Sequence, residues 1–163
     1  MLGIRTATEA DSDAIWNIFR EVVTAGDTYA FDPKMSPEEA LAYWFRADTR
    51  TYVAENDERI VGTYILTANQ PALGSHVANA AFMVASNARR LGVGRKMGEH
   101  CLSEARRLGF RAMQFNFVVS TNTSAIRLWQ KLGFRIVGTL PGAFRHRDAG
   151  YVDVYVIFRS FAD

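Results

Sequence analysis

Two glycines and four cationic side chains come together in one short stretch of the chain. The stretch reads Arg89-Arg-Leu-Gly-Val-Gly-Arg-Lys96, and it lies between an apolar run of strand character that ends near Ala85 and an amphipathic helical pattern. Glycine lets a ligand approach the main chain closely, and the first N–H groups of a helix have no intrahelical partner. Together with the basic side chains, these groups predict a site for a ligand that carries phosphates.

Two common phosphate-binding motifs do not fit this stretch. A Walker A loop needs Lys and then Ser or Thr after its second glycine, whereas Gly94 is followed by Arg95, Lys96 and Met97. A dinucleotide-binding fingerprint needs a third glycine at the position of Met97, and Gly98 comes one residue too late. The stretch is therefore neither a P-loop nor a good Rossmann motif.

A second distinctive segment reads Asn122-Thr-Ser-Ala-Ile-Arg-Leu-Trp-Gln-Lys-Leu-Gly-Phe134. Its apolar residues recur at helical spacing, which predicts a helix that starts near Asn122 and ends at Gly133. A strand is expected immediately before it, over Arg111 to Ser120, and another immediately after it, over Phe134 to Thr139.

These two segments resemble the two signatures of the GCN5-related N-acetyltransferase (GNAT) superfamily. Arg89 to Gly94 is similar to Q/R-x-x-G-x-G/A, and Asn122 to Phe134 is similar to N-x-x-A/S-I-x-L-Y-x-K-x-G-F. They occur in the family's order, and the roughly thirty residues between them accommodate the helix and strand of a βαβ unit. The sequence departs from the family at Trp129, where a tyrosine usually acts as general acid on the departing thiolate.

The resemblance implies an α+β fold with a mixed, bent β-sheet flanked by helices. The family's fourth and fifth strands splay apart, and the pantetheine arm of acetyl-CoA, the cosubstrate, enters between them. Carried over by position, the expected cofactor-binding residues are Phe82, Met83, Val84, Arg89, Arg90, Leu91, Gly92, Val93, Gly94, Arg95, Asn122, Ala125 and Trp129. The implied function is direct transfer of an acetyl group from acetyl-CoA to a primary amine of a small molecule or peptide.

The chemistry of transfer suggests roles for a few of these residues. A main-chain amide, assigned to Met83, would stabilise the oxyanion that forms when the amine attacks the thioester. Trp129 is expected near the thiol end, but an indole cannot serve as an acid. Tyr151 or Tyr29 could replace the missing tyrosine, or the thiolate could leave unassisted. The catalytic set is therefore Met83, Trp129 and Tyr151.

The general base and the class of protein stay open at this stage. Glu21, Asp27 and Asp32 are candidates to take the proton of the amine, and the loop from Asp27 to Asp32 could form one wall of the acceptor pocket. Because Trp129 replaces the acid, the alternative is a non-catalytic sensor or scaffold domain that binds acyl-CoA.

The remaining elements are expected to support this site. Asp11 is predicted to cap a first helix, and Ser36 and Glu39 form a capping box for a second helix that runs to about Arg46. The other predicted elements are strands at Gly3 to Thr8, Thr51 to Glu55, Arg59 to Thr67 and Gly150 to Phe158, a turn at Gln70 to Ser75, and a helix from Gly92 to Leu108.

Composition limits the other possibilities. A chain of 163 residues with 48% hydrophobic residues suits one domain spanning residues 1–163. The net charge of +2 is too small to indicate a nucleic-acid partner, and no apolar run suggests a membrane span or a signal peptide. The single cysteine, Cys101, forbids an intramolecular disulfide, which together with the missing signal peptide favours a cytoplasmic location. The three scattered histidines indicate no metal site, and a homodimer is compatible with the resemblance.

Overall fold

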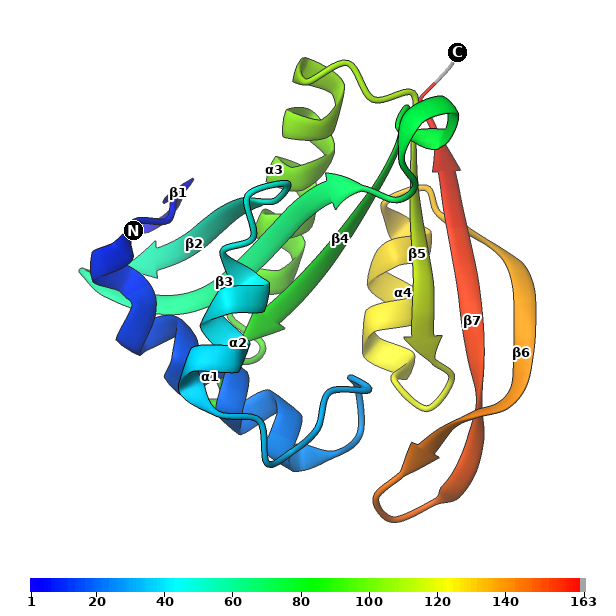
Figure 1. Ribbon diagram of the computed structural model, residues 1–163, viewed down its shortest axis with the longest axis horizontal. Coiled ribbons are helices and arrows are strands. Elements are labelled where there is room, and N and C mark those ends of the chain that lie inside the picture. Colours follow the sequence, from blue (N-terminus) through cyan, green and yellow to red (C-terminus); the bar gives the residue numbers. More distant parts are fainter. Residues whose placement is uncertain (162–163) are drawn as a thin grey trace.

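One mixed β-sheet of seven strands forms the centre of the computed structural model, which describes residues 1–161 (Figure 1). The strand order is β1-β2-β3-β4-β5-β7-β6, with β4 and β5 parallel and every other neighbouring pair antiparallel. The strands are β1 (Leu2–Thr6), β2 (Arg50–Asn56), β3 (Arg59–Ala68), β4 (Val77–Val84), β5 (Ala112–Val119), β6 (Arg135–His146) and β7 (Gly150–Ser160). This is the mixed sheet that the sequence predicted.

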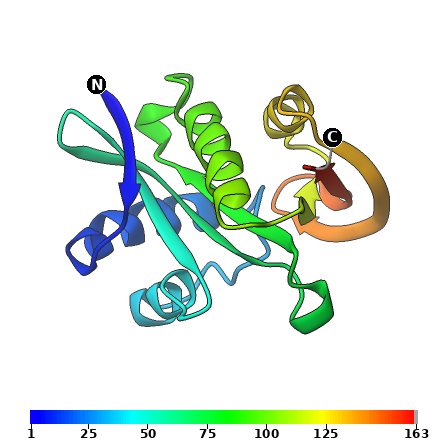
Figure 2. The ribbon, with the colours of Figure 1, turned by 90° about the horizontal axis from the view of Figure 1, so that it is seen from above.

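Four helices cover the two faces of the sheet. Helices α1 (Ser12–Ala25) and α2 (Pro37–Trp44) lie on one face, and α3 (Val93–Arg107) and α4 (Thr123–Lys131) lie on the other (Figure 2). Each helix buries one apolar stripe: Ile15, Ile18 and Phe19 of α1 are at most 4% exposed. None of the helices in residues 1–161 is long and apolar enough to cross a membrane.

The parallel strands β4 and β5 stay together for only a short distance. Their pairing covers Val77 with Ala112 and Ala78 with Met113, after which the strands diverge (Figure 1). The register of β5 against β7 shifts between Phe115 and Val118, which marks a bulge in β5 beside the divergence. Beyond these two pairs the sheet is therefore split between β4 and β5, with β1 to β4 on one side and β5, β7 and β6 on the other.

Most of the predicted elements are confirmed with small changes at their ends. The capping box of α2 is present: the Glu39 N–H donates to Ser36 Oγ at 3.1 Å, and the Ser36 N–H donates to Glu39 Oε2 at 2.9 Å. Helix α2 ends at Trp44, two residues earlier than predicted. Strand β6 is longer than predicted because it continues through two register shifts, and Pro141 lies in the second of these.

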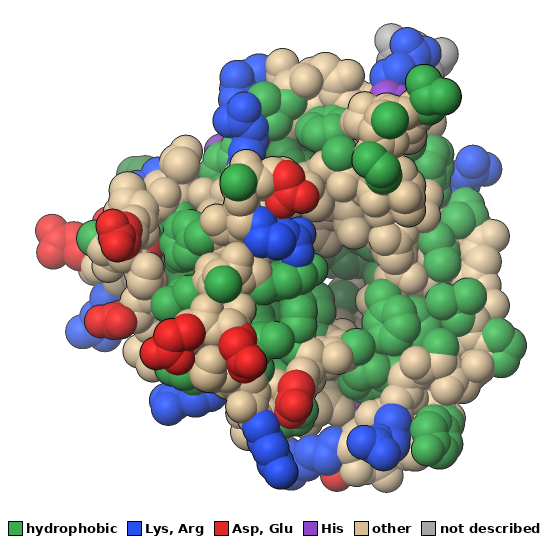
Figure 3. Space-filling view, in the orientation of Figure 1, with side chains coloured by type: hydrophobic (Ala, Val, Ile, Leu, Met, Phe, Trp, Pro, Cys, Tyr) green, Lys and Arg blue, Asp and Glu red, His purple; other side chains and the backbone are tan. Residues whose placement is uncertain are grey.

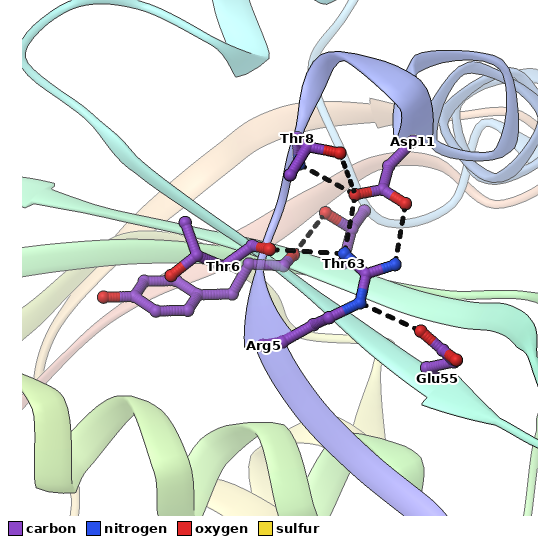
Figure 4. A network of polar contacts seen from close by, with 7 residues as sticks. Arg5, Thr6, Thr8, Asp11, Glu55 and Thr63 are labelled. Atoms are coloured by element: carbon purple, nitrogen blue, oxygen red, sulfur yellow. Dashed lines mark hydrogen bonds and ion pairs between the residues drawn. The ribbon is translucent and has the colours of Figure 1, made fainter.

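Asp11 occupies the N-cap position of α1, as predicted, but its side chain makes no capping hydrogen bond to that helix. Its carboxylate instead accepts two hydrogen bonds from the guanidinium of Arg5, at 2.8 and 2.9 Å, and one from the Thr8 N–H at 2.8 Å (Figure 4). Arg5 also bonds Glu55 of β2 at 2.9 Å. Asp11 is thus used to tie strand β1 to the chain that enters α1, and its oxygens are not available to the first turn of that helix.

Candidate functional site

A cavity of about 940 Å³ lies where β4 and β5 part. The space-filling view shows the molecule hollowed at this position, with hydrophobic side chains around the opening (Figure 3). The walls come from both strands, from the turn before α3, from α4 and from the loop that follows α1. Of the fourteen residues predicted for the site, the cavity is lined by Phe82, Met83, Val84, Arg89, Arg90, Gly92, Val93, Gly94, Arg95, Asn122, Ala125 and Trp129.

Two of the predicted site residues lie elsewhere. Leu91 is 61% exposed and does not line the cavity, although its neighbours in the turn do. Tyr151, which was predicted as a catalytic residue, is 75% exposed and pairs with Arg145 near the tip of the β6–β7 hairpin. The structure does not bring Tyr151 together with Met83 and Trp129, because the hairpin carries it away from the gap between β4 and β5.

The turn before α3 has the geometry of an anion site. Arg90 and Gly92 both adopt left-handed conformations, with φ of 68° and 75°, and this brings the chain sharply into the helix. Helix α3 is joined to Gly92 by a hydrogen bond of 3.0 Å from the Lys96 N–H to the Gly92 carbonyl. No side chain caps the start of the helix. The N–H groups of Val93, Gly94 and Arg95 precede that bond, so they can bind an anion.

Three of the four basic side chains predicted around this turn line the cavity. Arg89, Arg90 and Arg95 do so, and Arg95 is also held by Glu99 one helical turn later at 2.9 Å. Lys96 does not, because its ammonium donates to the carbonyl of Leu2 in β1. Arginine binds phosphate oxygens through a planar set of donors, so these three side chains suit a diphosphate.

Along β4, the main-chain N–H and carbonyl groups of every second residue point into the gap. The Ala85 N–H donates to Val61 and the Val77 carbonyl accepts from Asn69, which shows that odd-numbered residues of β4 bond β3. Phe82 and Val84 therefore point their main-chain groups into the gap. The role predicted for the Met83 amide is wrong in this arrangement, because that amide faces Thr63 of β3.

The main chain of Phe82 already has a partner on this edge. The Tyr29 hydroxyl donates to the Phe82 carbonyl oxygen at 2.7 Å and accepts from the Phe82 N–H at 2.9 Å. Tyr29 belongs to the loop between α1 and α2, 53 residues earlier in the chain. Burial raises the pKa of Tyr29 to about 12, so its phenol stays neutral at ordinary pH. A single hydroxyl thus joins this loop to the open edge of β4.

Trp129 forms the aromatic centre of the far wall. Its ring lies 4.8 Å from that of Phe82 and 4.7 Å from that of Phe115, between centroids, and it is 8% exposed. A Cβ placed at Gly98 of α3 would lie 3.0 Å from the indole, so α3 and α4 pack closely at this residue. Asn122 and Ala125 line the cavity along the start of α4, although the Asn122 side chain makes no capping bond.

The three acids proposed as general base are now distinguishable. Glu21 accepts from the Ser86 N–H at 3.2 Å, and hydrogen bonding to the side chain and then the main chain of Ser86, with nearby Arg89, lowers the pKa of its carboxyl. Asp32 accepts from the Lys34 N–H at 2.8 Å and does not line the cavity. Asp27 is the one of the three that lines the cavity, so it is kept as the candidate for the general base.

Several lining residues had no individual signal in the sequence. Thr28, Phe31 and Tyr43 line the cavity on the side of α1 and α2, and Asn79 and Asn116 line it from the two splayed strands. Of the loop Asp27 to Asp32, which was expected to form one wall of an acceptor pocket, residues 27–31 line the cavity and Asp32 does not; its role toward an acceptor stays a prediction. The amides of Asn79 and Asn116 could have been placed only by knowing which face of each strand is turned to the gap.

The cysteine and the histidines lie outside this site. Cys101 is fully buried in the core, and burial raises the pKa of its thiol well above the ordinary value. His100 Nδ1 shares a hydrogen bond of 2.7 Å with the Tyr64 hydroxyl, and His146 Nδ1 accepts from the N–H groups of Asp148 and Ala149. No cluster of three metal-ligating side chains occurs in the part of the chain that the structure describes.

Comparisons with known proteins agree with this geometry. The model of the Acetyltransferase (GNAT) family matches residues 13–134. The N-acetyltransferase aca1 of Schizosaccharomyces pombe is 32% identical over 151 residues, which are 82% of this chain and 72% of the relative.

Solved structures are similar over nearly the whole chain. A GCN5-related N-acetyltransferase from Kribbella flavida is 47% identical with a TM-score of 0.94, and the match covers 98% of this chain and 97% of that chain. A GNAT superfamily phosphinothricin acetyltransferase from Sinorhizobium meliloti, solved in complex with acetyl-CoA, has a TM-score of 0.87 at 21% identity, covering 98% and 88%. The more distant of the two shows a shared fold.

Proposed function

Because the chain belongs to the Acetyltransferase (GNAT) family, we propose that it transfers an acetyl group from acetyl-CoA to a primary amine of a small molecule or peptide. The observation that carries this proposal is the continuous cavity from the α3 turn, through the gap between β4 and β5, to the loop at Asp27 to Phe31. One end offers free amides and three arginines to a diphosphate. The other end offers polar and aromatic side chains to a second substrate.

The residues along the cavity suit acetyl-CoA in their order. The N–H groups of Val93 to Arg95, with the arginines of the turn, would bind the diphosphate. The gap-facing edge of β4 at Val84 would receive the amide groups of pantetheine, as an added strand would. The thioester end would then lie at the gap-facing main chain of Phe82, beside the packed rings of Phe82 and Trp129 and next to the loop that carries Tyr29.

Transfer follows from placing an amine beside that thioester. The nitrogen lone pair attacks the carbonyl carbon, the C–N bond forms, and the C–S bond breaks to release coenzyme A as thiolate. One proton must leave the nitrogen, and Asp27, directly or through water, is the acceptor that the lining provides. No residue has to form a covalent intermediate, so the protein acts mainly by positioning the two substrates.

A sensor or scaffold that binds acyl-CoA without transfer is the alternative, since Trp129 cannot protonate the thiolate. The cavity argues against it, because besides the residues expected to bind acetyl-CoA it is also lined by Thr28, Phe31 and Tyr43. A pure binding domain has no need of this additional wall. Binding of acetyl-CoA without thiol release, for every amine in a broad panel, would favour the sensor.

The site can be tested at Gly94. A tryptophan there would fill the approach to the α3 amides, while a Cβ at this position meets its nearest neighbour, Leu128, at an ordinary 3.6 Å. Gly94→Trp should weaken acetyl-CoA binding in calorimetry by at least about tenfold and leave the circular dichroism spectrum unchanged. Gly3→Trp is the matched control, because a Cβ there has nothing within 4 Å and lies on β1. Equal affinity in both variants would place the acetyl-CoA site elsewhere.

A further inference from the structure

Along the edge of β4 that faces the gap, main-chain groups already have partners at three successive positions. Ala78 pairs with β5. The Ala80 N–H donates to the side-chain oxygen Oδ1 of Asn79 at 2.8 Å. At Phe82 the Tyr29 hydroxyl accepts from the N–H at 2.9 Å and donates to the carbonyl oxygen at 2.7 Å. These three positions therefore cannot offer their full set of hydrogen bonds to a ligand that pairs with β4 as an added strand.

Val84 is the next gap-facing residue, and it differs from the other three. Within residues 1–161, no hydrogen bond is found on the gap-facing main chain of Val84. It lies beside the start of α3, since a Cβ at Gly94 would lie 4.0 Å from the Val84 side chain. Successive residues on one edge of a strand are about 6.8 Å apart, so the occupied groups of Phe82 lie about 7 Å beyond Val84 along β4. A ligand bound at α3 therefore meets one open position and then a closed one.

The group that closes Phe82 comes from a distant and well-fixed part of the chain. Tyr29 lies 53 residues before Phe82, and its ring stacks on that of Phe31 with centroids 5.9 Å apart. The loop is anchored where Gly26 ends α1, because the Gly26 carbonyl accepts from the Arg147 N–H at 3.0 Å. Burial raises the pKa of Tyr29 to about 12, so at ordinary pH the hydroxyl keeps the proton that it donates to Phe82. One side chain thus satisfies both main-chain groups of Phe82, as a neighbouring strand would.

We propose that Tyr29 is a positioning residue for the thioester of acetyl-CoA, because its hydroxyl ends the pairing of the pantetheine arm with β4 at Val84. This inference rests on the proposed function. With the diphosphate held at the turn before α3, the arm can pair at Val84 and must stop at the occupied main chain of Phe82. The thioester is then kept at one depth in the gap. Transfer needs the amine nitrogen within about 3.5 Å of the thioester carbon, so a displacement of about 7 Å would prevent it.

A purely protective role is the alternative explanation of the occupied edge. Open strand edges can pair with other chains, and native proteins often cover them. Such a cover would be as useful at Val84 as at Phe82, yet Val84 is open and the occupied positions are those beyond it. This distribution matches the path of a ligand that enters from α3, and general protection of the edge does not explain it.

Hydrogen exchange of Tyr29→Phe, which removes the hydroxyl and keeps the ring, tests this role without an amine. In the free variant the Phe82 N–H should exchange at least about tenfold faster than in the wild-type protein, because it loses its acceptor. Saturating acetyl-CoA should slow exchange at Val84 in both proteins, but at Phe82 by about tenfold or more in the variant alone. Tyr155→Phe on β7, outside the cavity lining, is the matched control and should behave as wild type.

The position of the thioester can be observed directly with acetyl-CoA that carries ¹³C at the acetyl carbonyl. Bound to the wild-type protein, the label should give one NMR resonance, whereas Tyr29→Phe should give a second or a shifted one because the arm also pairs at Phe82. The kcat for any amine that the wild-type protein acetylates should fall at least about tenfold, while KM for acetyl-CoA stays within about threefold. A merely structural role of Tyr29 would lower the melting temperature and leave the resonance of the label unchanged.

The outcomes separate this role of Tyr29 from the proposed function. Added protection at Phe82 and a changed resonance in the variant, without thiol release from any amine, would contradict transfer and support the role of Tyr29. Thiol release, with no gain of protection at Phe82 and one unchanged resonance in Tyr29→Phe, would overturn that role and leave the transfer standing. In the wild-type protein itself, exchange at Phe82 that slows about tenfold with acetyl-CoA would also overturn it, because the arm would then have displaced the hydroxyl.

Discussion

At the scale of single residues, the site depends on which main-chain groups of β4 point into the gap. Even-numbered residues do so, and Tyr29 holds the N–H and carbonyl of Phe82 in one orientation. The Tyr29 hydroxyl fixes the main chain of Phe82 at the place where the thioester would meet the edge of β4 in the proposed complex. Phe82 is therefore set by the loop after α1, and Val84 is left for the pantetheine arm.

We expect Trp129 to shape the thiol end without acting as an acid. Trp129→Phe should keep turnover within a few-fold, because an indole N–H has no usable pKa. It should cost about 1–3 kcal/mol of stability, because the indole fills the space between Phe82, Phe115 and Gly98. Turnover under saturating acetyl-CoA and urea denaturation measure the two effects.

The tyrosine variant at the same position completes this test. Trp129→Tyr restores the residue usual in the family, and its turnover should exceed that of wild type when thiolate protonation limits the rate. A loss of several orders of magnitude in Trp129→Phe, with unchanged affinity for acetyl-CoA, would contradict the prediction. It would show that the indole N–H makes a specific bond during transfer.

Much of the acetyl-CoA end of the site could be predicted from sequence, because its residues are contiguous. Arg89 to Arg95 carry their own glycines, charges and helix start, so local rules place nearly all of them. The Met83 amide was misassigned because a shift of one residue along a strand exchanges the two edges. Thr28 and Tyr29 could be placed only by the fold, since the bond of Tyr29 to Phe82 joins residues 53 positions apart.

At the scale of elements, local signals again explain what was predictable. Ser36 and Glu39 bond one another's main chain, so four residues suffice to define the start of α2. The length of β6 was missed because Pro141 and Gly142 are typical of a turn, whereas in the structure they lie within the register shift between Leu140 and Phe144, and the pairing with β7 resumes after it. The carboxylate of Asp11 was assigned to a helix, while a tertiary partner, Arg5, binds it.

The Arg5 and Asp11 pair makes the attachment of β1 to α1 dependent on pH. The hydrogen bonds from Arg5 lower the pKa of Asp11 to about 2, below the ordinary value for an unfolded chain. A carboxyl whose pKa is lower in the folded state contributes its full stability above about pH 4 and loses it as the pH falls toward 2. Because Asp11 is buried but Arg5 is 44% exposed, we expect a contribution of about 1–2 kcal/mol at pH 7.

Asp11→Asn tests this contribution. Urea denaturation should show the variant less stable than wild type by about 1–2 kcal/mol at pH 7, and the difference should shrink at pH 2.5 as wild-type Asp11 becomes protonated. Comparing the variant with wild type at each pH removes the effect of Glu104, whose pKa Arg107 also lowers to about 2. Asp13→Asn, an exposed change on α1, is the matched control because it leaves the Arg5–Asp11 pair intact. A difference that stays constant between pH 7 and pH 2.5 would exclude the ion pair as its cause.

At the scale of the whole molecule, the gap between β4 and β5 forms part of a cavity that is lined from both faces of the sheet. The turn before α3 and the helix α4 belong to one face, and the loop carrying Thr28 and Tyr29 belongs to the other, yet all line one cavity. Two substrates could therefore approach from opposite faces and meet in the gap. The same opening leaves the sheet divided, because β4 and β5 pair at only two positions.

By binding in the gap between β4 and β5, acetyl-CoA should consequently hold the two parts of the sheet together. At a concentration one hundred times its Kd, it should stabilise the fold by about 2.7 kcal/mol and raise the melting temperature by about 5–10 °C. Hydrogen exchange should slow at the Val84 N–H, which gains a partner, and change less at the Phe82 N–H, which Tyr29 already binds. Gly94→Trp should show neither effect under the same conditions. A higher melting temperature without added protection at Val84 would mean that the ligand stabilises the protein from outside the gap.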